Sequence, residues 1–199
     1  MNKNDSGRRA DLLDASIEYM LQKGVADLSL RPLAAAVGSK ARLLVYHFGS
    51  KESLVSEAMI VVRGRVQQVF AALLRDGTQP TPNKVIRAFW NWATSKQHER
   101  YLRLFFEVQG LALQSPKRYG RYLEGAVSSW VEMMATILPE DLPRKKRRAL
   151  ASLAVSTTFG LLLDYLSSGE KKRTSDALSL FATQFDPVMK VYTKGIGKR

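Results

Sequence analysis

The sequence predicts an all-α protein, in which an N-terminal three-helix unit is joined by a long helix to a larger helical domain. Apolar residues recur at helical spacing, as at Leu13, Ile17, Met20 and Leu21, and no stretch of useful length alternates strictly between apolar and polar residues. Glycines also stand where these helices should end, and hydroxyl residues stand where they should begin. We therefore expect helices throughout the chain.

Each predicted helix has its own start and stop signals. Ser29, Ser50, Thr81 and Ser115 are placed as N-caps, and proline follows the last two, which suits the first position of a helix. The stop signals are Gly24, Gly38, Gly77 and Gly169. The expected helices cover residues 8–23, 30–37, 40–47, 51–75, 82–95, 99–114, 117–138, 143–168 and 175–193.

The predicted helices divide into two domains. We place the boundary after residue 50, so that residues 1–50 form the three-helix domain and residues 51–199 the larger helical domain. Residues 51–75 then serve as the connecting helix, and the break at 76–81, with Gly77 and Pro80, separates it from the helices that follow.

Composition excludes several classes of function. The chain has 199 residues and no cysteine, which removes disulfides, thiolate metal sites and cysteine nucleophiles together. His47 and His98 are the only histidines, too few for most metal or triad chemistry. We therefore expect no enzyme, no cofactor and no metal. Neither a membrane-spanning apolar run nor a signal-peptide pattern is evident, so we expect a cytoplasmic protein without a membrane partner.

Positive charge is abundant and widely distributed. Lysine and arginine number 31 against 18 acidic residues, for a net charge of +13. The densest run is residues 144–148, which follow Pro143 and open a predicted helix. This run is interpreted either as a solvated face or as a site for an anionic ligand or a second contact to nucleic acid.

Residues 29–48 have the spacing of a helix-turn-helix, with two short helices joined by a turn centred on Gly38. Ala34, Ala35 and Ala36 allow the second helix to approach closely. Leu33, Val37 and Leu44 supply a small shared core, which leaves Arg31, Lys40 and Arg42 on the open face. A helical hairpin inside any bundle would show much of the same pattern.

The stretch from about Arg9 to Leu54 resembles the DNA-binding domain of the TetR family of bacterial transcription regulators. The resemblance rests on Gly24, Ser29, Gly38, Tyr46-His47-Phe48 and the following residues 49–54, in that order. Val45 stands where the family usually has tyrosine, and the adjacent Tyr46 is similar to a subgroup that reads Arg-x-Leu-Leu-Tyr-His-Phe-Gly-Ser. Lys40 replaces the usual hydroxyl after the turn, which shifts the expected cap to Ser39.

The resemblance implies that the second helix of this motif enters the major groove of DNA. Its residues Lys40, Ala41, Arg42 and Leu43 are then candidates for base edges, and Arg42 suits guanine. Ser29, Arg31, Tyr46, His47 and Lys51 are candidates for phosphates, with Ser39 beside them. Lys51 places a positive charge in the first turn of a predicted helix, where it opposes the helix dipole, and a nearby phosphate would offset this unfavourable interaction. For Arg42 the alternative is a solvated surface charge, and Tyr46 also suits a core position.

Aromatic residues in the second part suggest a ligand pocket, although most of them must form ordinary core. Pockets are largely apolar with a few polar groups that orient the ligand, so we expect a mainly apolar small-molecule effector. Gln109 and Asp164 are polar residues embedded in apolar runs, and an exposed edge is the alternative for either. The candidate ligand-binding residues are Trp92, Phe105, Phe106, Gln109, Trp130, Met133 and Asp164.

Two apolar stripes near the C-terminus predict helix–helix packing. One contains Leu178, Phe181, Phe185, Val188 and Tyr192, and Asp186-Pro187 interrupts it. The other contains Leu150, Ala154, Thr157, Leu161 and Asp164. Two such helices from each of two chains would form a homodimer interface, as the resemblance also implies. Packing within a single chain is the alternative.

Together these features predict a homodimeric, ligand-responsive transcription regulator. The expected protein is a repressor that binds a near-palindromic DNA operator and releases it when an effector binds. One alternative is an all-helical enzyme acting on an acidic or nucleic-acid substrate. Another is a basic helical protein that binds nucleic acid or a membrane surface without sequence preference.

Overall fold

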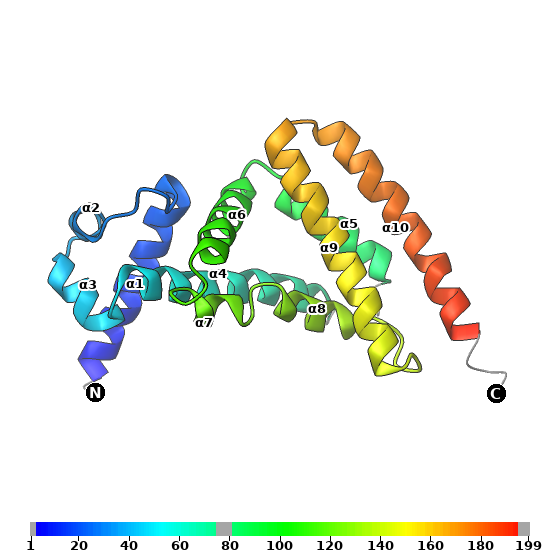
Figure 1. The fold of residues 1–199 in the computed structure, drawn as a ribbon, viewed down its shortest axis with the longest axis horizontal. Helices are drawn as coiled ribbons and strands as arrows, with labels where there is room; N and C mark the ends of the chain where they lie inside the picture. Colours follow the sequence, from blue (N-terminus) through cyan, green and yellow to red (C-terminus); the bar gives the residue numbers. More distant parts are fainter. Residues whose placement is uncertain (1–2, 75–80, 195–199) are drawn as a thin grey trace. The chain divides into compact units, whose positions relative to one another are not determined.

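The protein is all-α, as predicted. The computed structural model describes residues 3–74 and 81–194, and that part of the chain contains helices and no strand. The helices are α1 Lys3–Lys23, α2 Leu30–Ala36, α3 Ala41–Phe48, α4 Lys51–Leu74, α5 Pro82–Ala93, α6 Glu99–Gln114, α7 Gly120–Leu123, α8 Ser128–Ala135, α9 Arg144–Ser168 and α10 Lys171–Lys194 (Figure 1). The predicted stop at Gly77 and the break around Pro80 lie outside the described residues.

Most helices begin and end near the predicted residues, and residues 117–138 are the main exception. This stretch forms two helices, α7 and α8, where one continuous helix is expected. The start signal at Ser115-Pro116 opens a turn, in which the amide of Arg118 donates to the carbonyl of Ser115 at 2.9 Å. Gly120 and Gly125 also fall within the stretch, and glycine weakens a helix interior.

The helix ends show which of the predicted start and stop signals form caps in the structure. Gly24 and Gly169 follow α1 and α9 with φ of 74° and 73°, a conformation that favours glycine. The hydroxyl of Thr81 accepts from the amide of Lys84 at 3.4 Å, and the hydroxyl of Ser50 accepts from the amide of Ser53 at 3.0 Å. Ser29 stands at the N-cap of α2 without a side-chain hydrogen bond. The helix α10 runs through Asp186-Pro187 without a break in its assignment.

The chain forms two compact units. The first unit comprises Met1–Val66 and Arg100–Ala126, and the second comprises Gln67–Glu99 and Val127–Arg199. Packing thus places α6, α7 and most of α4 with the first three helices, a grouping that differs from the predicted boundary after residue 50. Local periodicity cannot indicate this, because it fixes which face of a helix is apolar and leaves its partner open.

The core of the first unit fills the space between α1, α2, α3, α4 and α6. Its most deeply buried members include Ile17, Met20, Leu33, Leu44, Leu54 and Val108. Polar contacts hold its edges. One oxygen of the Glu107 carboxylate accepts from the amides of Val25 and Ala26 at 2.9 and 2.5 Å, which joins α6 to the loop after α1. The guanidinium of Arg9 contacts the Glu57 carboxylate at 2.6 Å, and this hydrogen bond raises the pKa of Arg9.

In the second unit, α9 packs against α8 and α10, and α10 also packs along α5 (Figure 1). The interior is formed by Ile86, Trp90, Ala151, Ala154, Leu162, Leu178 and Phe185. The indole nitrogen of Trp90 donates to the hydroxyl of Ser175 at 3.0 Å, so the buried ring keeps its polar atom satisfied.

Candidate functional site

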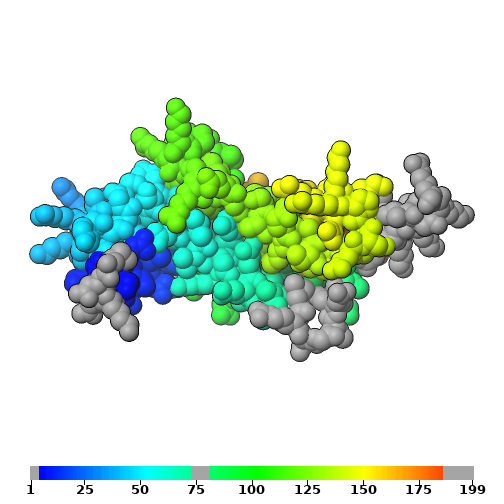
Figure 2. Space-filling view, turned by 90° about the horizontal axis from the view of Figure 1, so that it is seen from below, coloured from blue at the N-terminus to red at the C-terminus, as the bar shows by residue number. Residues whose placement is uncertain are grey.

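The helix α3 presents one face to the core and the opposite face to solvent. Leu44 and Phe48 are buried, and they face the buried Leu33 and Ala34 of α2 within one apolar cluster. The side chain of Tyr46 is 73% exposed. The surrounding segment, light blue to cyan in Figure 2, accordingly lies at the molecular surface. The sequence folds this way because Leu44 and Phe48 recur at helical spacing, which places both on one side of α3.

A groove runs along the exposed side of α3 and has a volume of about 650 Å³. Its lining consists of Arg8, Gly38, Ser39, Lys40, Arg42, Leu43 and Tyr46. The lining side chains include cations and no carboxylate, so the groove suits a polyanion. It brings together a large share of the predicted DNA-contacting residues.

Arg8 in α1 is a member of this groove that the sequence analysis missed. It stands next to Arg9, yet the two arginines serve different surfaces. The side chain of Arg9 reaches Glu57 and the carbonyl of His47 within the unit, whereas Arg8 is exposed and lines the groove. A hundred-degree turn between neighbouring helical residues separates them, and Arg9 stands four residues before Leu13, on the apolar side of α1.

Two of the predicted polar roles are corrected. The N-cap of α3 is Lys40 rather than Ser39, and it makes no side-chain cap hydrogen bond. The Ser39 hydroxyl is buried without a hydrogen-bond partner among the described residues, while its amide donates to the carbonyl of Ala34 at 2.8 Å. The side chain of His47 is only 3% exposed, and its Nε2 lies 3.9 Å from a carboxylate oxygen of Asp5. That burial removes His47 from the surface that a phosphate could reach.

The other predicted DNA-contacting residues remain near the surface to different degrees. Ser29 and Arg31 are exposed on α2, and Lys51 is half-buried in the first turn of α4. Ala41 and Leu43 are half-buried and pack partly against the core, although Leu43 also lines the groove. Arg42 is exposed in the first turn of α3, where early residues of a recognition helix meet base edges.

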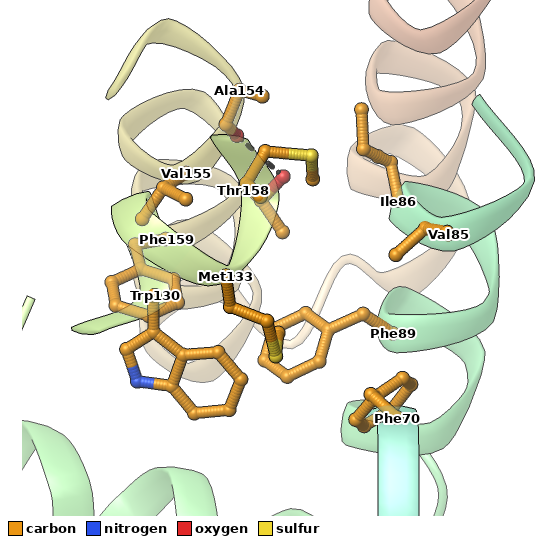
Figure 3. A pocket seen from close by; sticks show the side chains of 11 residues that line it. Phe70, Val85, Ile86, Phe89, Trp130, Met133, Ala154, Val155, Thr158 and Phe159 are labelled. Carbon is orange, nitrogen blue, oxygen red and sulfur yellow. Dashed lines mark hydrogen bonds between the residues drawn. The ribbon is translucent and has the colours of Figure 1, made fainter. Parts of the chain in front are cut away.

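A small apolar cavity lies inside the second unit, with a volume of about 30 Å³ (Figure 3). Trp130 and Met133, which are predicted ligand-binding residues, line it. The lining residues missed by the sequence analysis are Phe70, Val85, Ile86, Phe89, Met134, Ala154, Val155, Thr158 and Phe159. Thr158 is the polar member, and its hydroxyl already donates to the carbonyl of Ala154 at 2.8 Å.

Aromatic rings form a continuous cluster beside this cavity. The ring of Phe89 lies 5.2 Å from both Phe70 and Trp130, measured between ring centroids, and 6.3 Å from Phe159. Trp92 stacks on Phe89 at 6.1 Å without lining the cavity itself. The sequence contains these aromatics, but only the fold shows which of them meet.

The remaining predicted ligand-binding residues do not reach this cavity. Phe105, Phe106 and Gln109 lie on α6 in the first unit. The amide oxygen of Gln109 accepts from the hydroxyl of Tyr122 at 3.1 Å.

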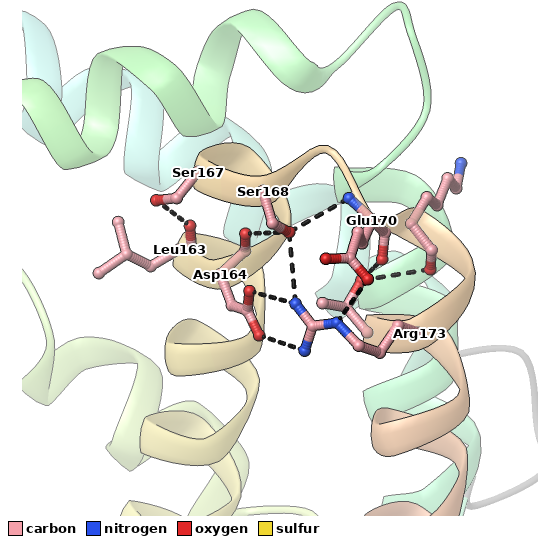
Figure 4. Close-up of polar contacts among 8 residues, drawn as sticks. Leu163, Asp164, Ser167, Ser168, Glu170 and Arg173 are labelled. Atoms are coloured by element: carbon pink, nitrogen blue, oxygen red, sulfur yellow. Dashed lines mark hydrogen bonds and ion pairs between the residues drawn. The ribbon is translucent and has the colours of Figure 1, made fainter.

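Asp164 is also displaced from its predicted role, because it lies on the partly exposed side of α9. Its carboxylate receives hydrogen bonds from both terminal nitrogens of Arg173, at 2.7 and 2.9 Å (Figure 4). These bonds lower the pKa of Asp164. Arg173 also bonds Glu170 at 2.9 Å, so the cluster ties the end of α9 to the start of α10.

The apolar stripes predicted for dimerisation largely form the interior of the second unit. Leu150, Ala154, Leu178 and Phe185 are buried within a single chain, and Thr157, Leu161 and Phe181 are half-buried. The alternative of packing within the chain is therefore correct for the four buried residues. The side chains of Val188 and Tyr192 are not among those that the structure describes.

A different apolar surface is left on these helices. Leu153 and Leu163 of α9 are 50% and 49% exposed, and Leu180 of α10 is 65% exposed. Among the described residues, α9 is also the one helix that is long and apolar enough to cross a membrane, with a mean hydropathy of 1.5 in its most apolar window and a third of that window buried. A core helix of a globular protein passes the same test. The basic run at 144–148 begins this helix, and Arg148 contacts Glu132 at 3.2 Å.

The fold and the groove define a class of protein, namely a helix-turn-helix protein that carries a second helical unit. Residues 12–58 match the family model of bacterial regulatory proteins of the tetR family. Over 180 residues, 89% of this chain and 88% of the relative, the sequence is 23% identical to the HTH-type transcriptional regulator BetI of Cronobacter sakazakii (strain ATCC BAA-894). The comparisons thus identify residues 12–58 as a DNA-binding segment of the tetR type, in a chain that is similar over most of its length to an HTH-type transcriptional regulator.

Two further comparisons cover a third and most of the chain, respectively. Over 65 residues, 33% of this chain and 30% of the relative, the sequence is 37% identical to the HTH-type transcriptional repressor KstR2 of Rhodococcus jostii (strain RHA1). The fold is similar to that of the multidrug binding protein EbrR complexed with imidazole, with a TM-score of 0.66 and 22% identity. That similarity covers 90% of this chain and 92% of EbrR.

Proposed function

We propose that this regulator is a homodimeric cytoplasmic repressor that binds a near-palindromic operator and releases it when a small molecule binds. The observation that carries the proposal is the groove along α3, where Arg8, Lys40 and Arg42 meet without a carboxylate. Insertion of α3 into the major groove would place Lys40 and Arg42 against base edges and Arg8 near a phosphate. The net charge of +13 adds a favourable long-range term.

The exposed apolar residues of the last two helices support a dimer interface. Leu153, Ser156, Gly160 and Leu163 follow one another along α9 at helical spacing, and all are exposed. Gly160 has nothing within 4 Å of the position that a Cβ would occupy, so a partner helix can approach closely there. Leu180 of α10 is a further exposed apolar residue. Pairing two such surfaces would present two reading heads to the half-sites of one operator.

The cavity of the second unit is the site that we assign to the effector. Its volume of about 30 Å³ is far below the ~300 Å³ that even a small drug-sized ligand requires. An effector would therefore have to stabilise an enlarged form of the unit. Met133 and Met134 line the cavity, and methionine side chains adapt readily to a new shape. Such a ligand lowers operator affinity if the enlarged form spaces the recognition helices badly.

The test begins with selection of bound DNA from a random pool, followed by binding measurements on the selected sequence. Arg42→Ala should then cost roughly 1 to 3 kcal/mol and relax preference at one base position. Lys51→Ala should weaken binding to all DNA sequences alike. The slope of log affinity against log salt concentration should become shallower by about one unit, as expected for the loss of one phosphate contact. Arg65→Ala is the control, because Arg65 lies outside the groove and pairs with Asp14.

The outcome distinguishes the proposal from its main alternative. A basic protein without sequence preference would enrich no sequence from the pool, and Arg42→Ala would then weaken selected and random DNA equally. Either result would remove the base-reading role of α3. Thermal melting against a metabolite set tests the effector separately, because a ligand of the folded state raises the melting temperature by mass action.

A further inference from the structure

Arg63 is the cation in the first unit whose surroundings the functions described above do not explain. It lies on α4 and is half-buried. Its terminal nitrogen Nη1 is buried and has no hydrogen-bond partner among the described residues. None of the ion pairs found between described residues includes Arg63. Burial lowers the pKa of this guanidinium.

Such an arrangement is costly in a protein that gains nothing from it. Buried charges are normally paired, and a buried N–H that lacks an acceptor costs about as much as a lost hydrogen bond. The partly buried Arg9 of the same unit follows the rule, because its guanidinium pairs with the Glu57 carboxylate. The exception therefore points to an acceptor that the protein does not itself supply.

The segment that follows α7 contacts this guanidinium. A Cβ added to Gly125 would lie only 2.9 and 3.0 Å from its two terminal nitrogens, so the guanidinium rests directly against the glycine backbone. Tyr122 of α7 is 1% exposed and stands three residues before Gly125 in the chain. The Tyr122 hydroxyl donates to the amide oxygen of Gln109 on α6, which leaves the amide NH₂ of Gln109 as a further donor.

The donors define the charge and the shape of the acceptor. A guanidinium forms paired hydrogen bonds with planar oxyanions, and a carboxylate matches its fork. A phosphate would bring nearly two negative charges to one cation. Tyr122 belongs to a cluster of buried apolar residues that includes Val62 and Ala126. The chemistry thus favours a carboxylate attached to an apolar body.

We propose that Arg63, with Gln109 and Tyr122, binds the carboxylate of a small aromatic or aliphatic acid. The binding claim stands on the first unit alone, whereas its regulatory meaning rests on the proposed function. Arg63 lies twelve residues beyond Lys51 on α4, about 18 Å along the helix from the end of α3. A ligand that joins α4 to α6 and α7 would alter how firmly the start of α4 supports the recognition helix.

The experiment uses the full chain and simple probes, namely benzoate and phenylacetate, with benzamide and phenylacetamide as matched neutral molecules. Melting shifts and isothermal titration should show binding of the acids and not of the amides. Arg63→Met should abolish the effect, and Arg65→Met on the same helix should retain it. Gly125→Ala, which pushes a methyl group against the guanidinium, should weaken binding, whereas Gly110→Ala, where a Cβ meets open space, should not.

Several outcomes would overturn the proposal. They are the absence of a shift with both acids, equal binding of acids and amides, and binding that survives Arg63→Met. Arg63-dependent binding of inorganic phosphate alone would mean an anion site without carboxylate preference. Without any probe, Arg63→Met should melt no lower than the unaltered protein, and a clear loss would show that the guanidinium is structural. Operator binding by the unaltered protein is measured separately, so its failure would remove the proposed function and leave the acid-binding result standing.

Discussion

Glu107 offers the sharpest test of how the helix-turn-helix is held in place. One oxygen of its carboxylate accepts from the amide of Val25 at 2.9 Å and from that of Ala26 at 2.5 Å, so α6 supports the loop between α1 and α2. Hydrogen bonds to a charged group contribute about 1.5 to 3 kcal/mol each, and the one at Ala26 is exposed and counts for less. Removing the carboxylate also leaves the amide of the buried Val25 without its acceptor.

We therefore expect Glu107→Ala to lower the free energy of unfolding by about 2 to 3 kcal/mol, and Glu107→Gln by about half as much. Glu18→Ala is the control, since its ion pair with Arg100 is long at 3.6 Å and exposed, and such pairs contribute about 0 to 1 kcal/mol. Urea denaturation measures the loss, and hydrogen exchange at the amides of Val25 and Ala26 locates it. A loss for Glu107→Ala no larger than for Glu18→Ala would refute this reasoning.

A double-mutant cycle isolates the same contact. Gly24 has φ of 74°, and a Cβ there would lie 2.8 Å from the Glu107 carboxylate. Gly24→Ala should thus destabilise the protein through both backbone strain and this clash. In the Glu107→Ala background only the backbone part should remain, about 1 kcal/mol. Additive losses would show that the two residues do not interact.

Two further predictions concern the second unit. Gly160→Leu should keep or raise the stability of the single chain, because the site is open and leucine favours a helix. The same change should dissociate the proposed dimer in sedimentation experiments. Gly110→Leu is the matched control, and an unchanged dimer would exclude this face as the interface. Asp164→Asn should lower the melting temperature at neutral pH. Hydrogen bonds from Arg173 depress the pKa of Asp164 in the folded protein below its usual 3.8, so the stabilisation is present above pH 3.8 and is lost as the pH falls through the folded-state pKa. The melting temperatures of the unaltered protein and Asp164→Asn should therefore converge in acid. A constant difference would refute the assignment.

The helix-turn-helix could be predicted from sequence because its signals are local. Gly24 and Gly38 adopt positive φ at helix ends, and the apolar positions Leu33 and Leu44 are buried where the spacing places them. Each of these features depends on residues within a few positions of one another. The order of residues along the chain thus determined the fold class and the exposed face of α3, which we propose to face DNA.

Local signals fail where a residue has more than one possible partner. Ala154 and Leu178 lie on stripes that suit either a second chain or a neighbouring helix of the same chain, and in the structure they are buried within one chain. Asp164 interrupts an apolar run, a pattern that suits either a pocket or the exposed edge of a helix. Its ion pair with Arg173 shows that it lies at the edge of α9. Periodicity fixes the direction of a side chain about its own helix, but not the helix that it meets.

The sequence by itself determined that this protein is helical and that residues 12–58 match the helix-turn-helix segment of the tetR regulators. Only the tertiary structure decided that Phe70, Phe89 and Trp130 meet around a cavity, that Arg8 joins the recognition groove and that Arg63 has a buried nitrogen without an acceptor. These features join residues that are far apart in the chain. Their proximity follows from how whole helices pack, which depends on the summed fit of many side chains rather than on any local pattern.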